Sequence, residues 1–198
     1  PAMRDDVLAH SARLIADGQL SHEYRFRCRD GRMIWVRDEL RVVPRRAAEA
    51  LEVAGAWTDI TANRRAEQLR SARAAVLDGV VASQPLPAIL ALIARSLEDL
   101  VPEMRVSILL LDARSGRLHV GAAPRLPDFY NAAVEGLEIG EGRGSCGTAA
   151  FRGGRVIVED IARHPYWQGF REVTARAGLR ACWSVPFKDT RGQVLGTF

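Results

Sequence analysis

The apolar positions of this chain follow two kinds of repeat, which together predict two sheet-containing regions joined by a helix. The first region starts with apolar residues at helical spacing, and Gly18 follows them as a helix end. Residues 22–58 then alternate between apolar and polar side chains, and Asp30-Gly31 supplies the pair that a tight hairpin requires. This pattern predicts a short helix before Gly18 and a three-stranded antiparallel meander over residues 22–58.

Residues 62–83 predict a longer amphipathic helix with a narrow apolar seam. One interpretation is a helix packed on its own domain. The other is a parallel two-helix linker between two copies of the chain, because small residues allow close approach. Gly79 weakens the end of this helix by ~1 kcal/mol relative to alanine and marks a soft joint. The residues expected at the helix pair are Ala66, Leu69, Ala72, Val76 and Val80.

The remaining residues, 84–198, mix helical and strand patterns. A broad helical face between prolines is followed by two strands around a turn at Ser115-Gly116. A cysteine-bearing turn, a strand, a helix over residues 166–178 and two strands over residues 179–187 and 193–198 complete the order. The whole chain is therefore predicted to be α+β, with a half-sheet, a linking helix, and a central antiparallel sheet flanked by helices.

Composition and charge exclude several classes of function. The chain has 28 basic and 24 acidic residues, a net charge of +4, and no basic cluster with stacking partners, so nucleic-acid binding is not expected. No stretch approaches the ~20 apolar residues that cross a membrane. The three cysteines are an odd number at wide spacing, and the four histidines are scattered, which predicts neither a disulfide framework nor a metal site. A cytoplasmic location follows as an expectation.

The first region resembles the C-terminal half of a PAS domain with its PAC strands. The resemblance rests on "EYRFRCRDGRMIWVRDELRVV" and "VAGAWTDITANRRAEQ", which end in the Asp-Ile-Thr motif of that family. It implies a partial PAS domain over residues 4–61 and a signalling helix over residues 62–83. The upstream strands that complete a PAS pocket are missing, so the resemblance gives no support for a haem or flavin there. The residues implied in signal relay are Asp59, Ile60 and Thr61.

Residues 84–198 resemble a GAF domain that lacks its C-terminal end. The matching words are "SILLLD", "GRGSCGTAA", "VIVEDIARHPYW", "AGLRACWSVPF" and "GQVLGTF". GAF domains are ligand-binding or dimerising sensor modules, and a PAS-then-GAF order is typical of bacterial sensor histidine kinases and cyclic-di-GMP signalling proteins. No output motif of those proteins occurs in this chain, so an enzyme is not expected here.

Cys146 in "GSCGTAAFRGG" is the most conspicuous candidate for chemistry. The string predicts a short helix with Ser145 as its N-cap, and a thiol at a helix N-terminus can have a lowered pKa. With Cys182, which the GAF resemblance places beside the same pocket, it resembles the cysteine pair of free methionine-R-sulfoxide reductases. Two departures stand against that enzyme: Trp183 replaces the acid after the second cysteine, and Gly136 stands where a third cysteine would fall. Both thiols could equally be small buried residues.

Several aromatic and acidic residues are candidates for the wall of a ligand pocket, because such sites combine aromatic walls with few polar groups. Trp183 is the favoured wall, while Trp167 could instead pack its loop onto the sheet. The sequence identifies no cofactor: it lacks the Cys-His pair of bilin attachment and the cyclic-nucleotide motif, and His119 is the least unsuitable single haem ligand. The pocket candidates are Cys146, Cys182, Trp183, Tyr166, Trp167 and Asp160.

These observations predict the sensory and dimerisation region of a bacterial signal-transduction protein. It would sense a small ligand or a redox state and relay it through a helix to an output domain, as a parallel homodimer. The alternative is a thiol enzyme resembling free methionine-R-sulfoxide reductase. A third interpretation is a structural spacer that binds nothing.

Overall fold

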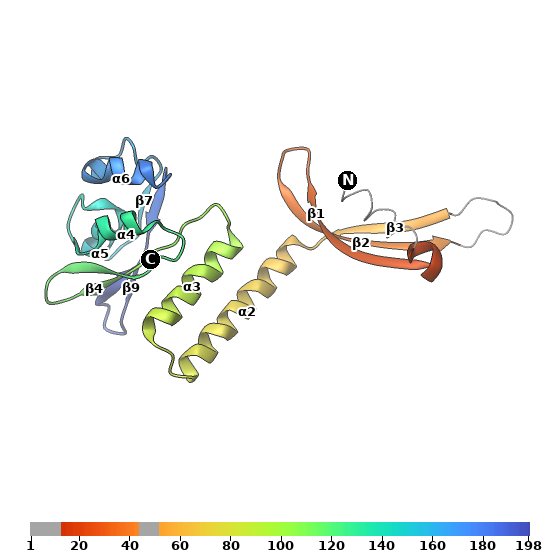
Figure 1. Cartoon of the computed structure of the whole chain (residues 1–198), viewed down its shortest axis with the longest axis horizontal. Helices are drawn as coiled ribbons and strands as arrows, with labels where there is room; N and C mark the ends of the chain where they lie inside the picture. The colour runs from red at the N-terminus through yellow and green to blue at the C-terminus, as the bar shows by residue number, and fades with distance from the viewer. Residues whose placement is uncertain (1–12, 44–51) are drawn as a thin grey trace. The chain divides into compact units, whose positions relative to one another are not determined.

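The structure is a computed structural model that describes residues 13–43 and 52–198. Its chain divides into two compact units, one up to Arg70 and one from Ser71 to Phe198, and each is described by itself (Figure 1). Most of the helix predicted before Gly18 lies outside the described residues. Its described end is helical, and Gly18, with a φ of 70°, follows it.

The N-terminal unit is a three-stranded antiparallel sheet in the order β1-β2-β3. The predicted meander is confirmed: the first hairpin turns at Gly31, whose positive φ of 85° is a conformation that glycine adopts without strain. Across this turn the Cys28 N–H donates to the Arg32 carbonyl at 2.8 Å. The strands are β1 (Gln19–Arg27), β2 (Met33–Val43) and β3 (Glu52–Asp59).

The Asp-Ile-Thr motif joins this sheet to helix α2 (Thr61–Val81). The Asp59 carboxylate accepts the Thr61 N–H at 2.9 Å, and the Thr61 hydroxyl accepts the Trp35 N–H at 2.8 Å. The Ile60 N–H donates to the Trp35 carbonyl at 2.9 Å, and the Ile60 side chain is buried. These bonds fix the first turn of α2 to strand β2.

Arg64 adds a second attachment one turn further along α2. Its guanidinium donates to the Glu23 carboxylate and lies 4.0 Å from the centroid of the Trp35 ring. Glu23 also accepts from Arg37 at 2.9 Å, so β1, β2 and α2 meet at one carboxylate. These hydrogen bonds hold the pKa of Glu23 below its usual range.

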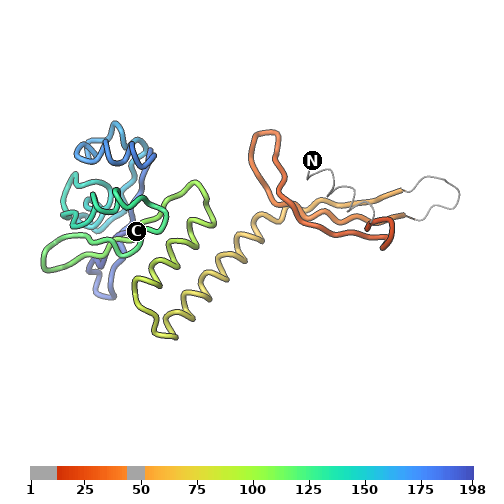
Figure 2. The backbone as a smooth tube through the Cα atoms, viewed as in Figure 1, coloured from red at the N-terminus to blue at the C-terminus, as the bar shows by residue number. Residues whose placement is uncertain are grey.

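The C-terminal unit combines helices with two antiparallel sheets, whose chain path can be followed in Figure 2. A five-stranded sheet has the order β6-β5-β4-β10-β9, and β7 pairs with β8. The helices are α3 (Leu86–Leu100), α4 (Asp128–Val134), α5 (Gly144–Arg152), the 3-10 helix η1 (Pro165–Phe170) and α6 (Arg171–Arg176). The strands are β4 (Ile108–Asp112), β5 (Arg117–Ala122), β6 (Leu137–Glu138), β7 (Val156–Val158), β8 (Cys182–Ser184), β9 (Pro186–Lys188) and β10 (Val194–Thr197).

The five-stranded sheet is packed on both faces, and strand β4 shows how. Ile108 and Leu110 pack in the cluster that contains α3, whereas Leu109 and Leu111 pack in the cluster that contains Ala150 of α5. Successive side chains of a strand point to opposite faces, so α3 covers one face and α5 the other (Figure 1). The predicted central antiparallel sheet with flanking helices is confirmed.

Two local expectations need correction. The helix predicted over residues 166–178 is a 3-10 helix followed by a short α-helix, and Gly169 inside the segment disfavours a continuous α-helix. The strand predicted over residues 179–187 is two short strands in different sheets, β8 and β9, separated at Val185. The main-chain groups of Val185 bond instead to Phe198, at 2.7 and 2.8 Å.

Gly79 lies inside α2 and is buried. A Cβ atom there would lie 3.7 Å from Cγ1 of Ile89 on α3, and the Gln84 N–H donates to the Gly79 carbonyl at 2.9 Å. The helix therefore runs through this glycine, and its lack of a side chain leaves room for the turn that leads to α3.

Candidate functional site

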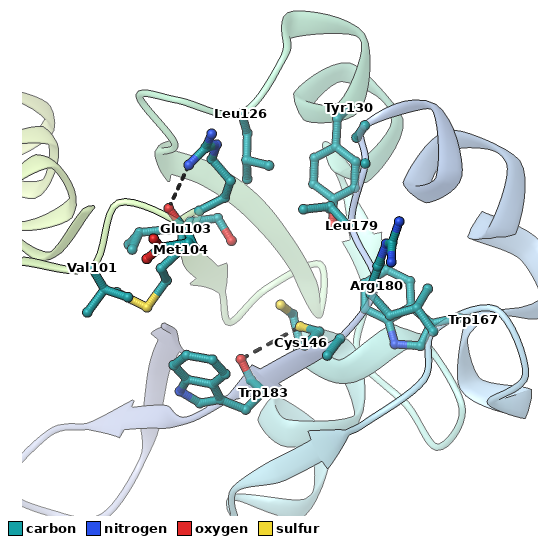
Figure 3. Close-up of a pocket in the computed structure, with 18 of the residues that line it drawn as sticks. Val101, Glu103, Met104, Leu126, Tyr130, Cys146, Trp167, Leu179, Arg180 and Trp183 are labelled. Atoms are coloured by element: carbon teal, nitrogen blue, oxygen red, sulfur yellow. Dashed lines mark hydrogen bonds between the residues drawn. The ribbon is translucent and has the colours of Figure 1, made fainter. Parts of the chain in front are cut away.

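A cavity of about 700 Å³ opens in the C-terminal unit. Residues 101–107, which connect α3 to β4, form one wall, and residues 177–183 form the opposite wall as they lead into β8. Tyr130 of α4 and Cys146 of α5 also line the cavity. Figure 3 shows Val101 and Met104 on one side, Tyr130 and Arg180 on the other, and Cys146 between them.

Four of the six predicted pocket residues line this cavity: Cys146, Cys182, Trp183 and Trp167. The remaining two, Tyr166 and Asp160, do not. The Tyr166 hydroxyl donates to the Glu141 carboxylate at 2.8 Å and accepts from Arg152 at 2.7 Å, on the surface. The Asp160 carboxylate accepts the Ala162 N–H at 3.0 Å and so stabilises a turn of its own loop.

The start of α5 positions Cys146 at the cavity. Ser145 is not the N-cap that the sequence predicts: it lies inside the helix, fully buried, and its hydroxyl accepts the Nε1–H of Trp167 at 3.1 Å. Gly153 ends the helix in the left-handed region, with a φ of 62°. Trp167 is 3% exposed and packs in the core, so its role here is to hold the first turn of α5 in place.

Burial disfavours the thiolate form of both cavity thiols. Burial raises the pKa of the Cys146 thiol, which is the opposite of the lowering expected at a helix N-terminus. Burial, together with the charge of a neighbouring Cys146 thiolate, raises the pKa of Cys182 to about 12. Near neutral pH both groups are therefore protonated, and a protonated thiol is a poor nucleophile.

The sequence interpretation missed all three charged residues at the mouth of this cavity. Glu103, Arg105 and Arg180 all line it. The Arg105 guanidinium donates to the carbonyls of Pro102 and Met104, at 2.9 and 3.0 Å. Glu103 and Arg105 follow α3 directly, whereas Arg180 precedes β8, and no motif marks any of the three as a binding residue.

His119, the residue considered as a haem ligand, does not line the cavity. Its Nδ1 lies 2.6 Å from a carboxylate oxygen of Glu135, whose other oxygen accepts the Val120 N–H at 2.8 Å. Within residues 13–43 and 52–198, no three His, Cys, Asp or Glu side chains gather as metal ligands would. In the same part of the chain, no helix has the length and apolarity that a bilayer crossing requires.

The predicted seam of α2 has mixed exposure. Ala72 and Val76 are half-buried, whereas Ala66, Leu69 and Val80 are exposed. The exposed fractions of Leu69 and Val80 are 48% and 55%. Within the described structure, a large part of the apolar surface of this helix is therefore exposed and contacts no other residue closely enough to be buried.

Comparison with family models decides the classification. The GAF domain model matches residues 83–198, which is more than half of the chain. The chain belongs to the GAF domain family. A model of the PAS fold matches residues 1–78, ahead of the GAF domain. A PAS fold followed by a GAF domain is a sensory arrangement, as the sequence motifs predict.

A curated relative supports the same class. The methyl sulfide methyltransferase-associated sensor of Methanosarcina acetivorans is 32% identical over 196 residues, which cover 98% of this PAS–GAF chain. The match covers 20% of that protein, so the chain spans about a fifth of its relative's length.

Two solved structures resemble the GAF domain. Free methionine-R-sulfoxide reductase from Neisseria meningitidis, determined in complex with its substrate, is 25% identical with a TM-score of 0.51 and covers 67% of this chain and 70% of its own. The GAF domain of a phosphoenolpyruvate-protein phosphotransferase from Coxiella burnetii is 20% identical with a TM-score of 0.52 and covers 67% and 76%. The second likeness concerns the fold alone.

Proposed function

We propose that this chain is the sensory region of a signal-transduction protein, in which the GAF cavity binds a small molecule. The observation that carries the proposal is a cavity of about 700 Å³, a size typical of small-molecule sites, lined mainly by apolar and aromatic side chains. One cavity wall, residues 101–107, directly follows α3, so an occupant that moves this wall acts on the end of that helix.

The proposed relay element is the helix over residues 62–83, between a partial PAS domain at residues 4–61 and the GAF domain at residues 84–198. Exposed apolar residues on α2, among them Leu69 and Val80, support a parallel pairing of two chains along this helix. Occupancy of the cavity would favour one of two helix packings. The output is that of a sensor histidine kinase, a diguanylate cyclase or a cyclic-di-GMP phosphodiesterase.

A thermal-shift screen against nucleotides, haem and small metabolites tests the ligand-binding part. A genuine ligand raises the melting temperature, and the increase grows with the logarithm of ligand concentration above its Kd. The variant Ala181→Trp should abolish the shift, because Ala181 lines the cavity, whereas the exposed Ala162 lies outside it and Ala162→Trp should retain the shift. Two results would count against a ligand in this cavity: no compound raises the melting temperature, or the increase persists in Ala181→Trp.

A second candidate function is reduction of free methionine-R-sulfoxide. Two cysteines that line one cavity, and the likeness to the reductase structure, favour it. The raised pKa of both thiols opposes it, since catalysis needs a thiolate. Turnover of free methionine-R-sulfoxide with a thiol reductant, abolished by Cys182→Ser, would establish this enzyme in place of the ligand sensor.

A further inference from the structure

The mouth of the GAF cavity has an arginine that the described structure leaves without a partner. Arg180 lines the cavity and is exposed, and its guanidinium has no hydrogen bond or ion pair with any described residue. Many other arginines of the GAF domain do have acidic partners. Examples are Arg117 with Glu138, Arg125 with Asp99 and Arg152 with Glu141.

The backbone holds Arg180 at this place. Its carbonyl accepts the N–H of the buried Ile161 at 2.8 Å, and the preceding Leu179 packs into two core clusters. The position of the residue is therefore set by the core, while its guanidinium forms no hydrogen bond or ion pair with a described residue. Figure 3 shows the Arg180 side chain at the edge of the cavity, across from Val101 and Met104.

The other charged groups of the mouth do not neutralise Arg180. The Arg105 guanidinium is held by two backbone carbonyls, so it adds positive charge but has fewer free donors. Glu103 lines the opposite wall and forms no ion pair with Arg180 among the described residues. One carboxylate against two guanidiniums leaves the mouth with an excess of positive charge.

The interior of the cavity has a different character. The buried part of the lining is apolar or aromatic: Val106, Leu126, Tyr130, Ile161 and Trp167. Burial raises the pKa of the Tyr130 hydroxyl, so that group stays neutral and adds no charge to the interior. A ligand with an apolar body and a single anionic end would match this distribution of polarity in the cavity.

We propose that the GAF cavity selects amphipathic carboxylates: molecules with an apolar, ring-containing body and one carboxylate that pairs with Arg180. Guanidinium and carboxylate form two parallel hydrogen bonds with fixed geometry, which gives both affinity and orientation. This inference rests on the proposed function, because it names the ligand class of the same cavity.

A matched pair of fluorescent probes tests it: 1-pyrenebutyric acid and its neutral analogue 1-pyrenebutanol, titrated at neutral pH. We expect the chain to bind the acid about five- to tenfold more tightly than the alcohol. Arg180→Gln should remove that preference, so that acid and alcohol bind about equally, while Arg180→Lys should keep part of it. Arg191→Gln is the matched control, because Arg191 is exposed on the β9–β10 turn and does not line the cavity.

The outcomes separate this inference from the proposed function. Equal binding of acid and alcohol to the unaltered chain, or a preference that persists in Arg180→Gln, overturns the carboxylate proposal and leaves the ligand cavity standing. Binding of neither probe overturns both. Glu103→Gln gives a check of sign: it removes the negative charge from the mouth and should strengthen binding of the acid.

Discussion

Single residues can determine whether the GAF domain folds, and Gly196 is the clearest example. A Cβ atom on this β10 residue would clash with the main-chain oxygen of Leu109 and lie 2.5 Å from Cζ of Phe187. We expect Gly196→Ala to destabilise the GAF domain by roughly 3 kcal/mol, because neither a strand backbone nor a packed ring can give way cheaply. Urea unfolding followed by fluorescence measures this change.

Gly154 supplies the control for that substitution. It has a negative φ, and a Cβ atom there would meet no atom within 4 Å. Gly154→Ala should therefore leave the midpoint of urea unfolding nearly unchanged. Equal effects of the two substitutions would contradict a steric role for Gly196.

The cavity thiols give a prediction about pH. Because the pKa of Cys182 is raised to about 12, its thiolate is scarce near pH 7 and becomes more abundant only as the pH rises toward that value. Alkylation by iodoacetamide should therefore be slow at pH 7 and accelerate up to at least pH 10, as measured by mass spectrometry of the labelled peptides. Rapid alkylation of Cys182 at pH 7 would instead indicate an activated thiol.

At the level of single residues, sequence motifs identified only part of the candidate site. Cys146, Cys182 and Trp183 were predictable because they stand in short strings typical of GAF domains. Tyr166 does not line this cavity although its neighbour Trp167 does, since successive residues of a 3-10 helix point in different directions. Arg180 was missed because an unpaired arginine is recognisable only once the positions of all acidic residues are known.

Among the helices, α3 depends on a buried carboxylate. Glu98 is fully buried, and one of its oxygens accepts the Val106 N–H at 3.0 Å while the other lies 3.6 Å from Nε of Arg125. Glu98→Ala should cost about 2–4 kcal/mol of unfolding free energy, because it leaves a buried N–H without an acceptor and removes one of the two carboxylates near Arg125.

Asp99 is the natural control, since its carboxylate contacts the same Arg125 at 2.5 Å but is largely exposed. Asp99→Ala should cost less than about 1 kcal/mol, as exposed ion pairs do. Chemical unfolding of both variants makes the comparison. Losses of similar size would show that Glu98 contributes no more than a surface ion pair.

The attachment of α2 to its sheet can be tested at Thr61. Thr61→Val removes the acceptor of the Trp35 N–H, which should cost about 1 kcal/mol and increase hydrogen exchange at that amide. Thr58→Val is matched in chemistry, because Thr58 lies exposed on β3 with no side-chain hydrogen bond among the described residues. Equal exchange at Trp35 in the two variants would contradict the role of Thr61.

Asp59 should make the same attachment sensitive to acid. Hydrogen bonds from the Thr61 hydroxyl and N–H hold the pKa of Asp59 below its usual value of 3.8. A carboxyl whose pKa is lower in the folded state stabilises the fold above its ordinary pKa and loses that contribution as the pH falls through the lowered value. Unfolding between pH 5 and pH 2 should therefore depend less on pH in Asp59→Asn than in the unaltered chain.

Most elements were predictable because their patterns are local. The first hairpin has alternating strands and an Asp-Gly turn, and α3 has apolar residues on one broad face between prolines. The division of residues 179–187 into two strands was not predictable, since it results from main-chain bonds between Val185 and the distant Phe198. Such long-range pairing leaves no periodic signal in the segment itself.

For the whole molecule, the decisive question is whether α2 pairs with a second copy. We expect the chain to sediment as a dimer, and Leu69→Glu with Val80→Glu to shift it toward monomer, because both side chains are about half exposed on α2. Ile157→Glu, on the GAF strand β7, is the control with similar exposure of 55%. Sedimentation of the unaltered chain as a monomer at high concentration would refute the paired helix.

The cavity wall at residues 101–107 directly follows helix α3 in the chain, and this continuity matters for the design of hybrid receptors. Helix α3 runs without interruption of the chain into residues 101–107, which line the cavity. A chimera joined at the α3–β4 connection would separate helix α3 from the cavity wall at residues 101–107. A fusion joined before Ser71 would transfer α3 and the cavity wall together. Hybrid receptors with this GAF domain should therefore be joined within the first half of α2.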